Sequence, residues 1–291
     1  MTKLRKLVAE ELAVPVDPRV TAVAAAIADK HGKSSYAVLF YGSCLRQQRL
    51  DGLMLDFYLI VSSYRQAYQK RWLAAANRAL PPNVFYFEKN GLAAKYAVLS
   101  EADFARECGP RPRSTSVAAR FAQPARLVWS RSKGTTAAIV DSISRCAPAL
   151  FAWTVPLEPK GTPVLDLWKR AFQLTFSAEL RAERNNRSAA IIEAEPERYT
   201  RFGEAALEQV STGNRRRAKR WWKRMQRKGK LLSVLRLAKA SATFAGGADY
   251  IAWKINRHAG TRIELKGWQR RWPLVAGLTL LPRLLKSGAV R

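Results

Sequence analysis

Apolar runs separated by short polar breaks occupy the first third of the chain and predict a sheet flanked by helices. The runs 36–41 and 54–61 have the length of buried strands. Asp17 and Pro18 form a helix N-cap and a first-turn proline ahead of an alanine-rich run, so a helix is expected from there to about His31.

The segments that follow continue this order. Residues 65–80 have the spacing of a helix, which Pro81-Pro82-Asn83 ends. Residues 84–87 and 95–99 are predicted strands joined through Asn90-Gly91. Helices and strands therefore alternate in an α/β order over roughly the first 110 residues.

A turn-rich, charged segment at 109–115 predicts a boundary, after which the pattern is mainly helical. We divide the chain into 1–112, a helical region 113–210 and a basic, tryptophan-rich region 211–291. Helices are expected at 164–184 and 231–244. The apolar stretch 268–286 is flanked by tryptophan and arginine, and it suits either a membrane surface or a C-terminal core helix.

The first predicted strand breaks at Gly42 and Ser43, a corner that is typical of nucleotide sites. A glycine lets phosphate approach the backbone, and a following helix offers free N–H groups. Thirteen positions after Ser43, Asp56 lies inside an apolar run, where a metal-bound carboxylate costs less than an unpaired one. We interpret Asp56 as a Mg²⁺ ligand; the alternative is an ordinary turn and a salt-bridged strand acid.

Charge and cysteine content narrow the class of protein. The 291 residues include 51 Lys+Arg and 22 Asp+Glu, a net charge of +29, which favours an anionic partner such as nucleic acid, anionic lipid or nucleotide. Three scattered cysteines indicate neither a zinc site nor a disulfide framework. Without a secretory pattern or an apolar run of about 18 residues, we expect a cytoplasmic protein that is soluble or peripheral on the membrane.

The densest basic run, 215–230, interleaves tryptophan with cations, a pattern typical of membrane interfaces that also suits base stacking. A solvated helix face is the simpler alternative. The residues expected to contact an anionic membrane are Arg215, Arg216, Arg217, Lys219, Arg220, Trp221, Trp222, Lys223 and Arg224.

Three blocks between residues 36 and 130 resemble the mitochondrial-type phosphatidate cytidylyltransferases, the translocator assembly and maintenance family. Phe40-Tyr-Gly-Ser43, with a glutamine shortly after and then Met54-Leu-Asp-Phe57, is similar to the family's Tyr-Gly-Ser-Gly block and Met-Ile-Asp-Phe strand. The second block is Val84-Phe-Tyr-Phe87 followed by Lys95-Tyr-Ala-Val-Leu-Ser100, which is similar to the family's Lys-Tyr-Gly-Val-Ile-Ser. Ala119-Arg-Phe-Ala-Gln-Pro124 resembles Gly-Arg-Leu-x-Lys-Pro.

The resemblance implies an α+β fold, with a nucleotidyltransferase domain followed by a helical, winged-helix-like domain. It implies transfer of a cytidylyl group from CTP to phosphatidate, with Mg²⁺, to give CDP-diacylglycerol. Gly42 and Ser43 would cradle the triphosphate, Asp56 would hold the metal, and Lys95 and Arg120 would meet phosphates. Arg126 would assist them; the alternative is an ordinary arginine on a helix surface. The chain departs from the family's pattern at Cys44, Glu88, Ala119 and Gln123.

The second acid that many relatives in the wider superfamily place two positions after the first is replaced by Tyr58. Asp51, on the preceding loop, is the nearest substitute. Two other functions therefore stay open: nucleotidyl transfer to RNA or to a soluble phosphorylated acceptor, and an inactive nucleotidyltransferase fold that serves as a basic binding module. Nucleic acid is a less favoured partner, and the sequence does not predict an oligomeric state.

Overall fold

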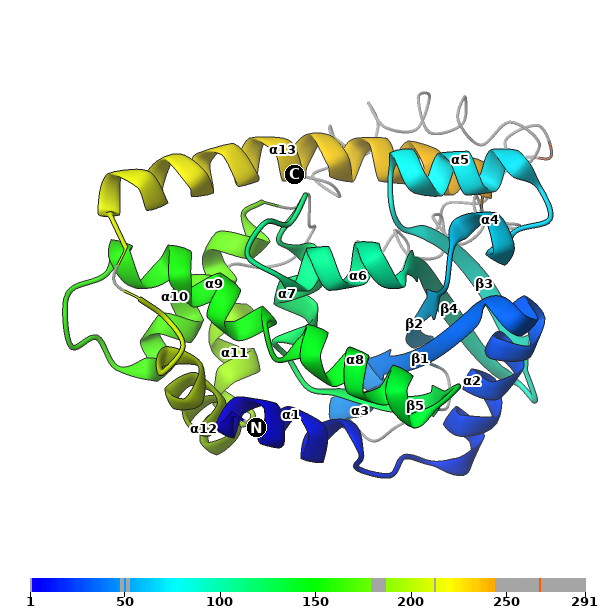
Figure 1. Ribbon diagram of the computed structural model, residues 1–291, viewed down its shortest axis with the longest axis horizontal. Helices are drawn as coiled ribbons and strands as arrows, with labels where there is room; N and C mark the ends of the chain where they lie inside the picture. Colours follow the sequence, from blue (N-terminus) through cyan, green and yellow to red (C-terminus); the bar gives the residue numbers. More distant parts are fainter. Residues whose placement is uncertain are drawn as a thin grey trace.

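A computed structural model describes residues 2–47, 50, 53–178, 187–211, 213–243 and 267 of the chain. Its centre is a five-stranded sheet with the order β3-β4-β2-β1-β5 (Figure 1). Only β2 and β4 pair in parallel; the other three neighbouring pairs are antiparallel. The strands are β1 (Ser35–Tyr41), β2 (Leu55–Val61), β3 (Asn83–Lys89), β4 (Leu92–Ser100) and β5 (Ala125–Ser130).

Helices surround the sheet and make up most of the described residues after β5, so the α+β class expected from the resemblance is confirmed. The helices are α1 (Lys3–Leu12), α2 (Pro18–His31), α3 (Ser43–Gln47), α4 (Tyr64–Ala67), α5 (Arg71–Ala79), α6 (Glu101–Cys108), α7 (Ser116–Phe121), α8 (Lys133–Ile143), α9 (Cys146–Thr154), α10 (Val164–Phe176), α11 (Arg187–Glu193), α12 (Pro196–Leu207) and α13 (Arg215–Thr243).

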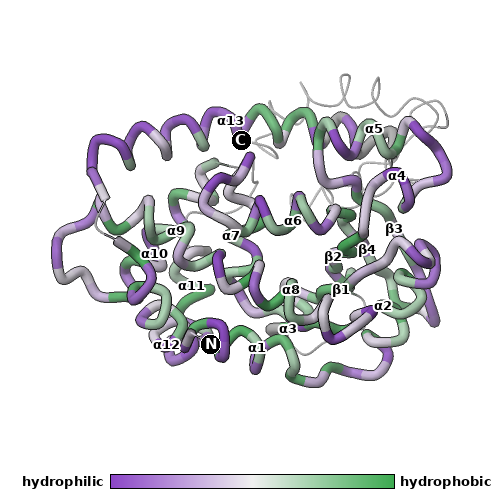
Figure 2. Tube along the Cα trace, viewed as in Figure 1, coloured by the Kyte–Doolittle hydropathy of each residue, from purple (hydrophilic) through white to green (hydrophobic). Residues whose placement is uncertain are grey.

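The two faces of the sheet contribute to two separate cores, because successive strand residues point to opposite sides. Phe40 and Phe57 belong to the core that α2 covers. Leu39, Tyr41 and Tyr58 belong to the larger core, which also includes residues of α1, α6, α7 and α8. The hydropathy-coloured trace shows the strands as mainly apolar (Figure 2).

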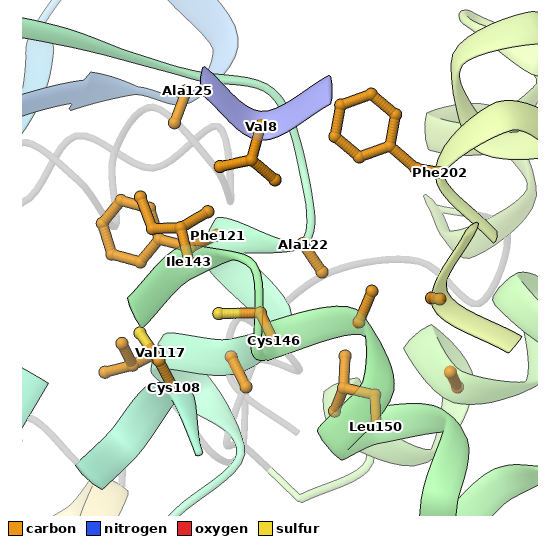
Figure 3. Packing of buried hydrophobic residues seen from close by; sticks show 14 of the residues in the cluster. Val8, Cys108, Val117, Phe121, Ala122, Ala125, Ile143, Cys146, Leu150 and Phe202 are labelled. Carbon is orange, nitrogen blue, oxygen red and sulfur yellow. The ribbon is translucent and has the colours of Figure 1, made fainter. Parts of the chain in front are cut away.

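The larger core extends from the sheet into the helical part of the chain without a break. Figure 3 shows Ala125 of β5, Val8 of α1, Phe121 of α7 and Phe202 of α12 around one apolar region. Cys146 of α9 lies in the same cluster and is completely buried. A single continuous core therefore joins the sheet to helices as distant in sequence as α12.

This core corrects the boundary expected at residue 112. The strand β5 lies beyond that position, yet it pairs with β1 and forms one edge of the sheet. Sequence reasoning treated the region after 117 as helical, because the pairing of Ala125–Ser130 with β1 joins residues that are far apart in the sequence. The boundary at 112 therefore divides the sheet, and the winged-helix-like arrangement of the second region stays a prediction.

The predicted helix 65–80 is also wrong, since it is two helices, α4 and α5, separated near Tyr68. Tyr68 adopts an extended conformation, and its side chain turns into the core, where the hydroxyl accepts a hydrogen bond of 3.0 Å from Asn77 Nδ2. Two other predictions are confirmed. Asp17 caps α2, and Asn90 and Gly91, both with positive φ, form the turn between β3 and β4.

The long helix α13 runs from the helical part of the chain to the far edge of the sheet (Figure 1). Near its beginning, Trp222 Nε1 donates to the carbonyl of Trp153 at 2.8 Å. Near its end, Arg236 Nε donates to the carbonyl of Pro81, and Lys239 Nζ to that of Pro82, at 2.8 and 2.9 Å. These contacts fix α13 at both ends.

Among the helices that the structure describes, none combines the length and apolarity needed to cross a lipid bilayer. The predicted segment 268–286 lies outside the described residues, as does the end of the predicted helix 164–184.

Candidate active site at the end of strand β1

The chain turns sharply at Gly42, where β1 ends and α3 begins. Gly42 has φ +99°, and a Cβ atom placed there would lie 2.8 Å from Asp56 Oδ2. The antiparallel register of β1 and β2 sets Tyr41 opposite Asp56, which brings the turn against the carboxylate. Only glycine fits both the conformation and the close approach.

Lys95 lies beside Asp56 because β2 and β4 are parallel and in register at these two residues. Lys95 Nζ is 3.0 Å from Asp56 Oδ1, with 27% of the lysine and 18% of the aspartate side chain exposed. The salt-bridged acid considered as an alternative for Asp56 is therefore present. The exposed part of each side chain leaves the pair accessible to an incoming ligand.

Arg120 reaches the same corner from α7. Its guanidinium carbon lies 4.8 Å from the centre of the Tyr41 ring, a cation–π contact. The next residue, Phe121, packs edge-on against Tyr58 at 5.2 Å between ring centres and so anchors the helix to the sheet. The structure therefore brings together Gly42, Asp56, Lys95 and Arg120, which lie far apart in the sequence.

Tyr58 explains why a second acid is missing from β2. It lies on the same face as Asp56 and is only 5% exposed, packed against Tyr41 and Phe121. A carboxylate there would be buried among aromatic rings at a high desolvation cost. The other candidate, Asp51, lies outside the described residues.

The described residues contain no group of three or more His, Cys, Asp or Glu side chains that could by itself hold a metal ion. Mg²⁺ at nucleotide sites, however, is often held by one or two carboxylates together with phosphate oxygens of the substrate. Asp56, partly exposed beside a turn without a side chain, meets that minimum. The residues present fit a metal that arrives with its nucleotide.

Two neighbouring residues have structural roles. Burial raises the pKa of the Cys44 thiol, and the negative charge of Asp56 adds to the effect. The thiol donates to the carbonyl of Met54 at 3.4 Å, so it is a neutral core group and no nucleophile. His31 packs against the same core as Cys44, with its ring nitrogens 3.0 Å from the Ala67 carbonyl and 3.1 Å from the Tyr96 hydroxyl.

Two other residues were predicted to contact phosphate. Ser43 is the exposed first residue of α3, which the structure describes from Ser43 to Gln47, and its role in phosphate binding stays a prediction. Arg126 lies in β5 rather than on a helix, and its Nη1 donates to the Ala125 carbonyl at 2.9 Å. It lines a separate cavity together with Glu11 of α1 and Arg198 of α12.

Sequence reasoning missed two residues beside the site. Tyr41 pairs with Asp56 and its ring contacts Arg120, and it could have been found as the last strand residue before the glycine. Tyr86 of β3 pairs in register with Lys95, and its hydroxyl donates to Glu88 at 2.6 Å. Side chains along the strand 84–88 alternate between the two faces of the sheet, which places Tyr86 and Glu88 on the same face. This alternation is the sequence signal for Tyr86.

The basic residues of α13 between 215 and 230 are exposed, but Trp221 and Trp222 are 8% and 2% exposed. Trp221 stacks on Trp153 with ring centres 4.8 Å apart. This corrects the expectation that both tryptophans contact a membrane, because they complete the core between α13 and α9. A surface for anions on α13 therefore consists of cations alone.

No protein-family model matches the chain, and no curated protein sequence matches it. Among solved structures, the chain is similar to a nucleotidyltransferase-like protein from Exiguobacterium sibiricum 255-15, with 10% identity over 92% of both chains and a TM-score of 0.28. A likeness at this TM-score and identity supports no conclusion about function.

Proposed function

We propose that the protein is a nucleotidyltransferase whose reaction takes place at the corner between β1 and β2. The observation that carries this proposal is the approach of Gly42 to Asp56, with Lys95 in contact with the same carboxylate. One partly exposed acid, a backbone turn without a side chain and two cations suit a nucleoside triphosphate. The second cation is Arg120, which stacks on Tyr41.

In the proposed reaction, a phosphate oxygen of the acceptor attacks the α-phosphorus of CTP, and pyrophosphate leaves. The protein holds the two anions in line and offsets their charge. Mg²⁺, when bound with the nucleotide at Asp56, supplies further charge neutralisation. Lys95 then exchanges its contact with Asp56 for a phosphate oxygen, and Arg120 binds a second phosphate.

The acceptor that we propose is phosphatidate, on the strength of the resemblance over residues 36–130. Because phosphatidate stays in the bilayer while CTP comes from water, the protein would work at the cytoplasmic surface of a membrane. The exposed cations of α13 supply a surface for anionic lipid, since each lysine or arginine near such a surface contributes about 1 kcal/mol.

The test is conversion of α-labelled CTP into lipid-extractable product in liposomes that contain phosphatidate. We expect Mg²⁺-dependent product in the wild type and a loss of at least about a hundredfold in Asp56→Asn. Asp166→Asn is the matched control, because Asp166 is an exposed acid on α10 paired with Lys169. A folded Asp56→Asn variant that keeps full activity would refute the role of this carboxylate.

Other outcomes separate the remaining possibilities. Label transferred to a soluble phosphorylated acceptor or to RNA, with no lipid product, would keep the nucleotidyltransferase and reject phosphatidate. No transfer from any nucleotide, together with no Mg²⁺-dependent binding of CTP, would reject the enzyme and leave a binding module.

The affinity for Mn²⁺ in the absence of nucleotide should rise in the Lys95→Met variant, because the lysine ammonium no longer competes with the metal for Asp56.

A further inference from the structure

A second cationic site lies between α10 and α13, in the helical part of the molecule and away from the sheet (Figure 1). The cavity has a volume of about 210 Å³. Arg215, Lys219 and Lys223 of α13 line it, and Arg170 lines it from α10. The reaction proposed at Asp56 uses none of these side chains.

The three cations on α13 are spaced four residues apart, so they project from one side of the helix. Like charges at this spacing destabilise a helix by about 0.2–0.5 kcal/mol per pair. Arg215 is also in the first turn, where the helix dipole disfavours a cation. This arrangement opposes the stability of the free helix and favours an anion at the same place.

Acids of the protein do little to neutralise this cluster. The sequence of α13 from Arg215 to Thr243 contains no aspartate or glutamate. In the part of the chain that the structure describes, Arg215, Lys219 and Lys223 form no ion pair with an acid. Arg170 is the exception, with its Nε 3.0 Å from Glu158 Oε1.

The cavity is built on rigid side chains. Trp222, which lines it, is almost completely buried and is fixed through its indole N–H to the Trp153 carbonyl. Gln226, also in the lining, donates from Nε2 to Ser177 Oγ at 2.8 Å. These contacts hold α13 in register with α9 and α10, so the backbone positions that carry the cations are fixed.

The size of the cavity limits the ligand. About 210 Å³ is smaller than the roughly 300–1,000 Å³ of pockets that enclose drug-sized molecules, so the cavity does not enclose a whole nucleotide. A phosphate group fits the size, and its several charged oxygens match four cationic side chains. A carboxylate would leave more of this positive charge without a partner.

We propose that this cavity, the α10–α13 pocket, binds a phosphate monoester group or inorganic phosphate as a site separate from the nucleotidyltransferase corner. The group comes either from a lipid headgroup at a membrane surface or from a soluble phosphate. This site does not depend on the reaction at Asp56.

The experiment is a calorimetric titration of the full chain with inorganic phosphate and with glycerol 3-phosphate, at low salt. The pocket variant is Lys219→Gln with Lys223→Gln. The control is Arg220→Gln with Arg224→Gln, which removes the same charge at the same spacing from exposed positions of α13 outside the cavity lining. Circular dichroism confirms that both variants fold.

We expect the wild type to bind one phosphate per chain at this site. The pocket variant should lose about 25-fold in affinity, at about fivefold for each cation removed, and the control should change by less than about threefold. Equal losses in the two variants would overturn the proposal, because they would indicate binding by net charge alone. Undiminished binding in the pocket variant would overturn it too.

Vesicles distinguish the two sources of phosphate. Pelleting is compared between phosphatidylcholine vesicles with phosphatidate, which has a phosphate monoester, and vesicles with equal charge as phosphatidylserine, which has a diester. Selective pelleting with phosphatidate that the pocket variant loses supports a lipid headgroup. Binding of soluble phosphate without this selectivity supports a soluble ligand, and failure of both kinds of binding overturns the site.

Discussion

Replacing Gly42 by alanine tests the geometry of the candidate site most directly. The new Cβ atom would lie 2.8 Å from Asp56 Oδ2, whereas ordinary contact begins at 3.4 Å, so the two atoms must separate by about 0.6 Å. The carboxylate also contacts Lys95 at 3.0 Å, and moving it strains that ion pair. The substitution therefore disturbs the conformation of the turn and the position of the acid together.

Gly161→Ala supplies a matched control for the first of these effects. Gly161 has φ +82°, close to the +99° of Gly42, but a Cβ atom there would meet nothing within 4 Å. We expect Gly161→Ala to cost about 1–2 kcal/mol from backbone strain alone. Gly42→Ala should cost about 2–4 kcal/mol, because the contact with Asp56 adds to the strain.

Thermal unfolding measures this difference. At about 2 °C for each kcal/mol in a chain of this size, the melting temperature should fall by about 4–8 °C in Gly42→Ala and about 2–4 °C in Gly161→Ala. Nucleotidyl transfer should fall about ten- to a hundredfold in Gly42→Ala only, since a displaced catalytic group loses its alignment. Equal loss of stability and unchanged transfer in both variants would refute the close approach of Gly42 to Asp56.

Two further predictions concern stability. Arg198→Met should destabilise the protein by about 3–5 kcal/mol in urea unfolding, because it leaves Glu11 nearly buried without its partner at 2.9 Å. Adding Glu11→Gln should recover part of this loss, and additive losses would contradict the pairing. Desolvation lowers the pKa of His31, whose neutral ring can donate to one neighbour and accept from the other. The stabilisation of the folded state by the neutral His31 ring is therefore complete above the unfolded-state pKa of about 6.5. It is lost as the pH falls through the lower pKa of the folded state. The wild type should lose stability below about pH 6.5 faster than His31→Gln, and parallel pH profiles would argue against a neutral buried ring.

Features of the fold that depend on neighbouring residues were predicted better than features that depend on contacts between distant residues. The cap at Asp17 and the turn at Asn90-Gly91 were predicted correctly, since each depends on neighbouring residues and their backbone conformations. The helix 65–80 was not, because the spacing does not show that Tyr68 is drawn into the core by a hydrogen bond with Asn77. The strand β5 was missed for a similar reason: its pairing with β1 is a long-range contact.

The sequence by itself predicted Gly42 and Asp56 of the candidate site, because they stand out as a break and an acid in apolar runs. Tertiary structure alone decided that Asp56 is paired with Lys95, through the parallel register of β2 and β4. It also decided that Trp222 is a core residue while the cations beside it are exposed. The physical reason is that composition states which groups are present, but register and helix packing determine which of them meet and which face water.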